Sequence, residues 1–462
     1  MPGIFQSLDI ARRAIWASRL GMDVTSHNIA NVNTLGYSRQ RVENRAATPL
    51  SLPQGMLGMG VQVGDIIRVR NGLLDSQYRQ TNHMLSSATA REDIYNQIEV
   101  ILQEPSETAI GSQINEFFRE FSHLAADPEN TAIRNTIVQK SKSLTEAFRG
   151  QSEQITKLSE SIKNNAMAAV DQVNEIARQI AELNGKITGN EFNSFGANDL
   201  RDRRDMLVDR LSDYMKVSYS ENSRGQITVV AEGMNLVSGV KANTLKAELS
   251  NDGGNLQLAI KGSNGNSGLI KSGKLGALLQ MHNQEIPDLM EKLDTLAAGF
   301  IEEVNRIHSA GQGLATGDPP TPSTGINFFT GNSASTINIS SEILNDISKI
   351  AASNDGTPGN GDVALAISNI RNTKIFNGGT QTLDDYYTGI IKNMAIDIET
   401  AQNSRHSNQL LKEQIQNQRE SESGVSLDEE MTNLIKYQRS FEAAAKVVQV
   451  VDQMMETVVN MI

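Results

Sequence analysis

The residue types that most often do chemistry in proteins are sparse and scattered in this chain. Cysteine is absent, which excludes thiol catalysis, disulfides and cysteine-ligated zinc. The histidines form neither a close pair nor the HExxH spacing of a zinc site. They are His27, His83, His123, His282, His308 and His406. Carboxylates are abundant, but no pair stands in an apolar setting that would raise a pKa. We therefore expect no catalytic, cofactor-binding or metal-binding residue, no cofactor, and a protein that is not an enzyme.

One dense run of charge, DLRDRRDMLVDRLS at 199–212, is the strongest candidate for a cluster of catalytic carboxylates. Its charges follow the spacing of one helical turn. Asp199 and Arg203 stand four residues apart, and so do Arg201 and Asp205. Ion pairs of this spacing are typical of the exposed side of a helix. We therefore interpret the run as a solvated helix face and not as a catalytic site.

The composition narrows the class of protein. The 462 residues carry a net charge of −12, which disfavours a binder of nucleic acid or of anionic membranes, because either needs a basic face. Aromatic residues make up only 5%, so one large compact core is not expected. Asp9, Arg12 and Arg13 interrupt the apolar stretch that a Sec signal needs. No run approaches the ~20 apolar residues of a membrane span. By these rules alone the protein would stay in the cytoplasm.

The elements that organise the chain are its two terminal helices. Each carries a row that alternates by four and three residues, the period of a coiled-coil seam. The first row is Ile4, Leu8, Ala11, Ile15, Ser18, Met22, Thr25 and Ile29. The second row is Leu434, Tyr437, Phe441, Ala444, Val448, Val451, Met455, Val458 and Ile462. Ser426, with Glu429 three residues later, predicts a capping box at the start of the last helix.

These rows allow two interpretations. Two amphipathic helices could pack on one globular core, or the rows could pair with each other and with neighbouring copies. The rows match in period and length, and they lie at the chain ends, which usually fray. We therefore favour an assembly interface built from the terminal helices.

The first helix ends in an unusual segment, NIANVNTLGY. Asn28, Asn31 and Asn33 disfavour a continued helix because asparagine amides compete for nearby backbone groups. Gly36 can supply a positive φ, and Tyr37 closes the segment. We interpret these five residues as a helix stop and turn that sends the chain outward at a fixed point.

The pattern between the ends predicts a nested, mainly α fold with a β insertion. It consists of terminal coiled-coil helices, an elongated bundle of long helices, and a small β domain at the tip, where the hydrophobic period changes from helical to two. The predicted domains are the terminal assembly domain (1–36 and 426–462), an extended or β connection (37–70), the helical bundle (71–215, 270–310 and 362–425), the β domain (216–269) and an irregular insertion (311–361).

Two terminal motifs and several central ones resemble a known family. SHNIANVNTLGYSRQ and SGVSLDEEMTNLIKYQRSFEAAAKVVQVVDQMMETVVNMI resemble the N- and C-terminal motifs of bacterial flagellar axial proteins, the family of rod, hook and hook-associated proteins. Between them, DLRDRRDMLVDRLS, GKLGALL, LDTLAAGFIEEVNRIHSAGQG, IAAS and LDDYYTGII are similar, in this order, to its hook-associated members. The family usually has Pro where this chain has Leu35, so Gly36 must supply the turn angles alone.

The resemblance implies a structural role in the flagellum. It implies a ring of copies at the junction between hook and filament, in contact with the hook protein and with a second junction protein of the FlgL type. Export by the flagellar type III apparatus, without cleavage of a signal, then replaces the cytoplasmic expectation with an extracellular one. A cytoplasmic chaperone of the FlgN type is expected on the C-terminal helix, because an exposed apolar row invites aggregation. Neither nucleic acid nor membrane insertion is expected.

Three other functions compete with this one. Another axial subunit, of the hook or distal rod, would share both ends but should lack the long helices predicted for 128–190. A wall hydrolase built on an axial protein would need an acid/base pair in 216–269 or 311–361. A surface adhesin would use 216–269 to bind glycans.

Overall fold

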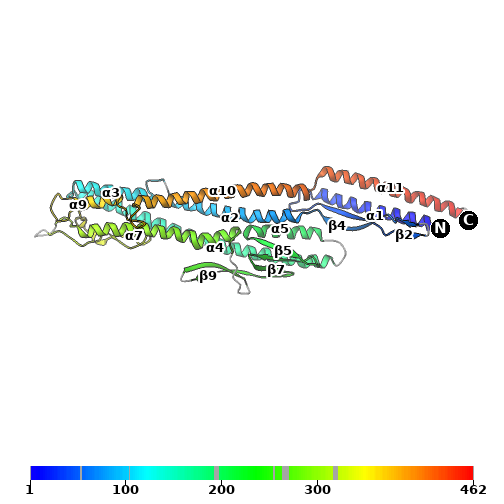
Figure 1. Cartoon of the computed structure of the whole chain (residues 1–462), viewed down its shortest axis with the longest axis horizontal. Helices are drawn as coiled ribbons and strands as arrows, with labels where there is room; N and C mark the ends of the chain where they lie inside the picture. The colour runs from blue at the N-terminus through cyan, green and yellow to red at the C-terminus, as the bar shows by residue number, and fades with distance from the viewer. Residues whose placement is uncertain are drawn as a thin grey trace.

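The chain folds into a long rod with both of its ends at one end of the rod (Figure 1). The computed structural model describes residues 2–52, 55–103, 105–191, 197–252, 255–262, 270–315 and 321–460. The chain runs to the far end through α2 (Gly72–Leu102) and α3 (Ile110–Ala126) and comes back through α4 (Thr131–Glu191). It runs out again through α7 (Ile286–Ala310) and returns to the terminal end through α10 (Leu383–Ser423). The mainly α fold with a β insertion confirms the predicted fold class.

The elements follow one another in this order. The helices are α1 (Pro2–Ala30), α2 (Gly72–Leu102), α3 (Ile110–Ala126), α4 (Thr131–Glu191), α5 (Asn198–Tyr214), α6 (Gly273–Gln280), the π-helix η1 (Met281–Glu285), α7 (Ile286–Ala310), α8 (Ser341–Asn345), the 3-10 helix η2 (Ile347–Lys349), α9 (Asp362–Ser368), the 3-10 helix η3 (Asn369–Asn372), α10 (Leu383–Ser423) and α11 (Leu427–Asn460). The strands are β1 (Gln40–Ala46), β2 (Leu50–Leu52), β3 (Gly55–Leu57), β4 (Val61–Arg68), β5 (Val217–Glu221), β6 (Ile227–Ala231), β7 (Met234–Ser238), β8 (Lys241–Ala242), β9 (Leu245–Asp252), β10 (Asn255–Gly262), β11 (Phe329–Thr330) and β12 (Asn338–Ile339).

One end of the rod is formed by α1, α11 and strands β1 to β4, which we call the terminal module. α1 and α11 lie side by side and run in opposite directions (Figure 1). β1 pairs antiparallel with β4, with Gln40 opposite Arg68, and β2 pairs with β3 beyond them. β1 and β4 both contact α1. The segment after the first helix is thus a long β hairpin that lies back along that helix.

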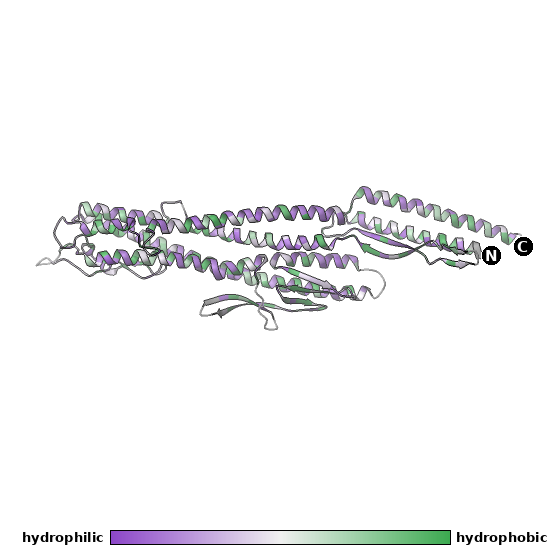
Figure 2. Ribbon diagram, in the orientation of Figure 1, coloured by the Kyte–Doolittle hydropathy of each residue, from purple (hydrophilic) through white to green (hydrophobic). Residues whose placement is uncertain are grey.

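The shaft of the rod is a bundle whose main member is the 61-residue helix α4. One face of α4 carries apolar side chains at intervals of about one or two turns, and they are almost completely buried. They include Ile137, Leu144, Phe148, Ile155, Ile162, Val173, Ile180 and Ile187. Figure 2 shows hydrophobic and hydrophilic residues alternating along the long helices, as expected for amphipathic helices. Burial of each large side chain contributes about 1.5–3 kcal/mol, which stabilises a helix that propensity alone would not.

The β insertion lies on the flank of the bundle and not at its tip (Figure 1). β5 to β8 form a four-stranded sheet, and β9 and β10 form a hairpin. Ile227, Val229 and Leu236 are fully buried in the same core as the helices, and β7, β8 and β9 contact α4. The predicted position at the tip was wrong, because these strands need the apolar face of α4 to cover their own buried side.

The far end of the rod is closed by part of the segment predicted as an irregular insertion. Phe328 and Phe329 in this segment are almost completely buried and pack against Phe117 of α3, at ring-centroid distances of 5.7 and 5.5 Å. The short elements β11, β12 and α8 also lie here. The segment is therefore irregular in backbone but contributes to the core.

A buried histidine joins this closing segment to α7. His308 is 1% exposed, and its Nδ1 donates to the carbonyl oxygen of Ile326 at 2.7 Å. Its Nε2 accepts from the backbone N–H of Ala351 at 2.9 Å. The bond accepted at Nε2 requires the neutral ring, because the protonated ring has a hydrogen on both nitrogens. Burial lowers the pKa of His308 to about 4, and the buried Arg134 acts in the same direction, while the Ile326 carbonyl opposes them.

We expect this histidine to make the fold acid-sensitive. The unfolded side chain, with a pKa near 6.5, binds a proton between about pH 6.5 and pH 4, whereas the folded one does not. Above about pH 6.5 the neutral, buried ring of His308 therefore contributes about 3 kcal/mol to the free energy of unfolding. This contribution is lost as the pH falls from about 6.5 to about 4. Urea unfolding at neutral and at acidic pH should therefore show a smaller acid loss for His308→Gln than for wild type. Equal acid losses would exclude His308 as the source.

Candidate assembly site

The predicted rows of the two terminal helices meet in one seam between α1 and α11. On α1, Ala11, Ser18 and Thr25 are buried, Ile15, Met22 and Ile29 are half-buried, and Leu8 is 37% exposed. On α11, Ala444 and Val451 are buried, and Leu434, Tyr437, Phe441, Val448, Met455 and Val458 are half-buried. The side chain of Ile4 and the whole of Ile462 lie outside the described residues. The structure thus brings the two rows together within one chain, and their contact with other copies stays a prediction.

A glycine sets how closely the two helices approach. A Cβ atom on Gly21 would lie 2.7 Å from two ring carbons of Tyr437, well inside van der Waals contact. Gly21 itself is buried. Only the smallest residue therefore fits here, and the pair Gly21–Tyr437 fixes the register of α1 against α11.

We expect Gly21→Ala to weaken this helix pair by about 1–2 kcal/mol, because overpacking outweighs the better helix propensity of alanine. Hydrogen exchange of α11 backbone amides should accelerate. Gly150→Ala in α4 is the matched control, since nothing lies within 4 Å of its added Cβ. This control should stabilise its helix by about 0.5–1 kcal/mol. Slower exchange in Gly21→Ala would show that the ring of Tyr437 moves aside freely.

The helix stop is built around the side-chain amide of Asn28, which is 1% exposed. Its Nδ2 donates to the carbonyl oxygen of Gln40 at 2.8 Å and to Glu430 Oε2 at 2.9 Å. Its Oδ1 accepts from Tyr37 Oη at 2.7 Å and from the Gln40 backbone N–H at 3.0 Å. All four hydrogen-bonding positions of the amide are filled. Asn28 thus ties together the end of α1, the start of β1 and the start of α11.

The other residues of the motif shape the turn. Asn31 Nδ2 donates to the carbonyl oxygen of His27 at 2.9 Å, while Asn33 is exposed. Gly36 has φ +76°, and a Cβ there would lie 2.0 Å from the sulfur of Met206. Burial, and then nearby carboxylates, raise the pKa of Tyr37, so its hydroxyl stays protonated and can donate. This arrangement fits the predicted turn, but its role in assembly stays a proposal.

One side of the charged run at 199–212 is a buried docking surface, so its interpretation as a solvated face was wrong for that side. Asp202 and Asp205 are each 4% exposed. Arg68, at the end of β4, donates to both carboxylates, at 2.7 and 2.8 Å.

Two further contacts strengthen this joint. Arg70 donates to Asp205 at 2.7 Å and forms a bidentate pair with Asp75 of α2. Asp202 also accepts from the backbone N–H of Ser38 at 2.9 Å. These bonds anchor the terminal module to the bundle.

Arg39 ties the same joint to the C-terminal part of the chain. Its backbone N–H donates to the carbonyl oxygen of Ser423 at 3.0 Å, at the end of α10. Its guanidinium contacts Glu429 at 2.6 Å and the buried Glu430 at 2.8 Å. Ser426 stands directly before α11, as the predicted capping box requires. The side chain of Glu429, however, bonds Arg39. The reciprocal bonds between Ser426 and Glu429 therefore stay a prediction.

Sequence reasoning missed the residues that make this joint: Arg39, Arg68, Arg70, Asp75, Asp202, Asp205 and Glu430. One signal was available, since Glu430 stands four residues before Leu434 and so occupies a position of the apolar row. A buried charge in an apolar row requires a partner, and Arg39 and Asn28 supply it.

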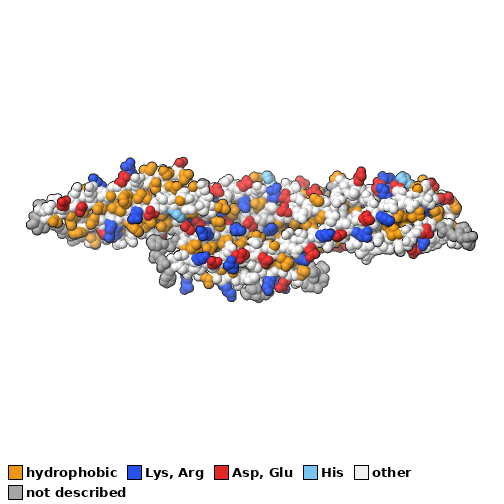
Figure 3. Space-filling view, turned by 180° about the vertical axis from the view of Figure 1, so that it is seen from behind, with side chains coloured by type: hydrophobic (Ala, Val, Ile, Leu, Met, Phe, Trp, Pro, Cys, Tyr) orange, Lys and Arg blue, Asp and Glu red, His pale blue; other side chains and the backbone are white. Residues whose placement is uncertain are grey.

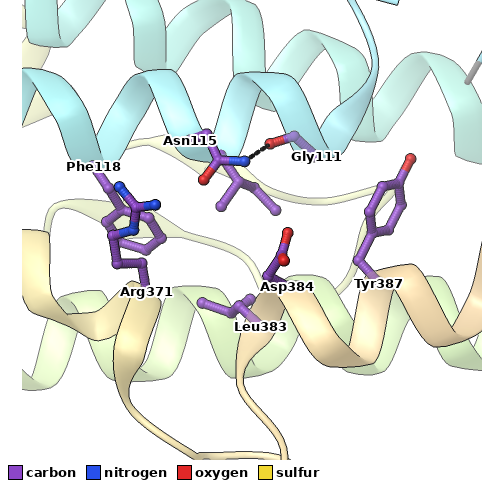
Figure 4. A pocket seen from close by; sticks show the side chains of 8 residues that line it. Gly111, Asn115, Phe118, Arg371, Leu383, Asp384 and Tyr387 are labelled. Carbon is purple, nitrogen blue, oxygen red and sulfur yellow. Dashed lines mark hydrogen bonds between the residues drawn. The ribbon is translucent and has the colours of Figure 1, made fainter. Parts of the chain in front are cut away.

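Among the described residues, no group of three or more His, Cys, Asp or Glu side chains is close enough to hold a metal ion. The pocket in Figure 4, between α3 and α10, has a volume of about 10 Å³, room for about one water molecule. In it Asn115 bonds the carbonyl oxygen of Gly111, and Arg371 and Asp384 come from separate elements. No described helix combines the length and the apolar character that crossing a membrane requires.

Comparison with known proteins agrees with this geometry. Residues 95–329 match the family model of the flagellar hook-associated protein FlgK helical domain, and residues 416–461 match that of the flagellar basal body rod FlgEFG protein C-terminal domain. Flagellar hook-associated protein 1 of Bacillus subtilis is 28% identical, with 100% of this chain and 99% of the relative covered. The Escherichia coli protein of the same name is 25% identical over 96% and 97%. The solved structure of the flagellar hook junction protein FlgK from Burkholderia pseudomallei shares the fold, with a TM-score of 0.62 at 17% identity, covering 77% of this chain and 100% of that one.

Proposed function

Because the chain belongs to the FlgK family of flagellar hook-associated proteins, we propose that it is a structural protein of the junction between hook and filament. One observation carries the proposal best. The two terminal segments, joined by a bond between residues 402 positions apart (Asn28 and Glu430), form one module whose orientation on the bundle is held by buried ionic contacts such as Arg68 to Asp205. A module of this kind can be packed side by side into a ring while the bundle projects from it.

The finer assignments follow from the family and from the terminal module. The chain associates with other flagellar axial components, and we propose that these are copies of itself in a ring, the hook protein and a second junction protein of the FlgL type. The chain is an exported component of the flagellum, and we propose the flagellar type III apparatus as its route and an FlgN-type chaperone on α11 before export. A structural role without catalysis completes the proposal.

The predicted domains translate into roles in this scheme. Residues 1–36 and 426–462 would assemble the ring. Residues 37–70 would connect this terminal module to the bundle and orient it. The helical segments would form the bundle that projects from the ring. The predicted interface rows on α1 and α11 would act by shaping the helix pair that neighbouring copies meet. The buried contacts of Asn28 and Asp205 support this division of labour.

The location of the protein on intact flagella tests the proposal. Immunogold labelling should place it at the junction between hook and filament. A strain that produces the chain without 427–462 should swim poorly and shed filament protein into the medium, because the seam with α1 is gone. Label along the whole hook would instead favour a hook subunit, and normal swimming of the truncated strain would contradict assembly through the terminal helices.

A further inference from the structure

α11 carries a second coiled-coil row that no described part of the chain covers. Its residues again alternate by three and four, and all are exposed and uncharged. They are Ser440, Ala443, Val447, Val450, Met454 and Thr457. The exposed fractions of Val447, Val450 and Met454 are 45%, 39% and 52%. We call this set the outer row. An apolar row with this period is typical of a seam that packs against another element.

A second exposed apolar surface of the terminal module lies between α1 and β2. Phe5 and Leu8 of α1, Leu50 of β2 and Met59 line a groove of about 460 Å³. The first three are 58%, 37% and 45% exposed. Figure 3, seen from behind, shows hydrophobic side chains on the surface at the terminal end of the rod. The module thus presents an apolar ridge on one helix and an apolar groove beside the other.

Ridge and groove lie at the same height along the module. Gly21 faces Tyr437, and the two helices are antiparallel. Leu8 stands 13 residues before Gly21, and Val450 stands 13 residues after Tyr437, so the two lie at corresponding points along the pair. Copies related by rotation about an axis along these helices would therefore bring the ridge of one level with the groove of the next.

The charges also allow this contact. The outer row has no charged member. The charged residues that line the groove are Asp9 and Arg12, and they already pair with each other at 2.9 Å. Docking would therefore bury no unpaired charge from the groove or from the outer row itself. A ring needs two different, complementary surfaces on each subunit, because only a head-to-tail contact repeats around an axis of more than two copies.

We propose that the outer row of one copy docks into the groove between α1 and β2 of the neighbouring copy. This inference rests on the proposed ring. It assigns each chain two seams on α11: the row from Leu434 to Val458 packs against the chain's own α1, and the outer row packs against the next copy.

Cysteine cross-linking on intact flagella tests the pairing, since the chain has no cysteine of its own. A strain would co-produce two single variants of different size, Leu8→Cys with an epitope tag and Val450→Cys without one. Mild oxidation should give a disulfide-linked product that contains one tagged and one untagged chain. Such a product can form only between two molecules. Gln449→Cys, at the same height but on another face of α11, is the matched control and should give no such link.

A charge placed in the ridge gives an independent measurement. Val450→Asp should prevent incorporation into flagella, because its carboxylate would enter an apolar groove, whereas Gln449→Asp should be incorporated normally. Incorporation of Val450→Asp at the wild-type level, or cross-links between two copies of Val450→Cys in place of links to Leu8→Cys, would overturn the pairing and leave the junction role intact. Absence of the unmodified protein from flagella would overturn the proposed function and the pairing together.

Discussion

Asp205→Ala should loosen the joint between the terminal module and the bundle by about 3 kcal/mol. Asp205 accepts from Arg68 at 2.8 Å and from Arg70 at 2.7 Å and is almost completely buried. Burial alone would raise the pKa of its carboxyl, but Arg70 and Arg68 hold that pKa below its usual range. Without the carboxylate, two buried guanidinium groups lose a partner. The loss stays near the lower end for a broken buried pair, because Arg68 keeps Asp202 and Arg70 keeps Asp75.

Hydrogen exchange at the joint measures this loss. The backbone N–H groups of Ser38 and Arg39 bond across it, to Asp202 and to Ser423. We expect them to exchange about a hundredfold faster in Asp205→Ala, the factor that corresponds to roughly 3 kcal/mol. Arg203→Ala changes an exposed residue on the same helix and should leave the exchange unchanged. Equal acceleration in both variants would mean that any change to α5 loosens the joint and that the ion pairs have no special part in it.

The seam between the terminal helices could be predicted from the sequence because its cause is local. The 3.5-residue period of Leu434, Tyr437 and Phe441 is visible within one helix, and a partner helix with the same period stands at the other end of the chain. What the period cannot tell is which contacts occur within one chain. The structure places this row against α1 and leaves the outer row exposed.

The joint could not be predicted, because its partners are distant in sequence. Asp205 lies 137 residues from Arg68 and 135 from Arg70. Within 199–212 the local spacing offers Arg201 as a partner for Asp205, yet Arg201 pairs with Glu221 at 2.7 Å. The local charge pattern predicts the ion pairs of an isolated helix. In the folded chain, tertiary contacts determine which ion pairs form. The β insertion was misplaced for a similar reason, since a period of two identifies strands but not the surface that covers them.

The second large loss of stability is expected for Asn28→Ala, in the helix-stop motif. Removal of this amide leaves the backbone N–H and C=O of Gln40, the Glu430 carboxylate and the Tyr37 hydroxyl each without one bond. At about 1–3 kcal/mol for each buried unsatisfied group, partly offset where water enters, we expect a loss of at least about 3 kcal/mol in the terminal module. The turn and the start of α11 should then separate, and cells should lose swimming and shed filament protein.

Two further variants make the Asn28 result specific. Asn33→Ala, in the same motif but exposed, should swim normally. Asn28→Asp keeps the size of the side chain but replaces the donor that faces Glu430 Oε2 at 2.9 Å with an oxygen, so it should be no better than alanine. Soft-agar swimming and filament protein in the culture supernatant measure all three. If Asn28→Asp swims like wild type, the side chain only fills space; if Asn33→Ala fails as well, the motif acts through its backbone turn and not through the buried amide.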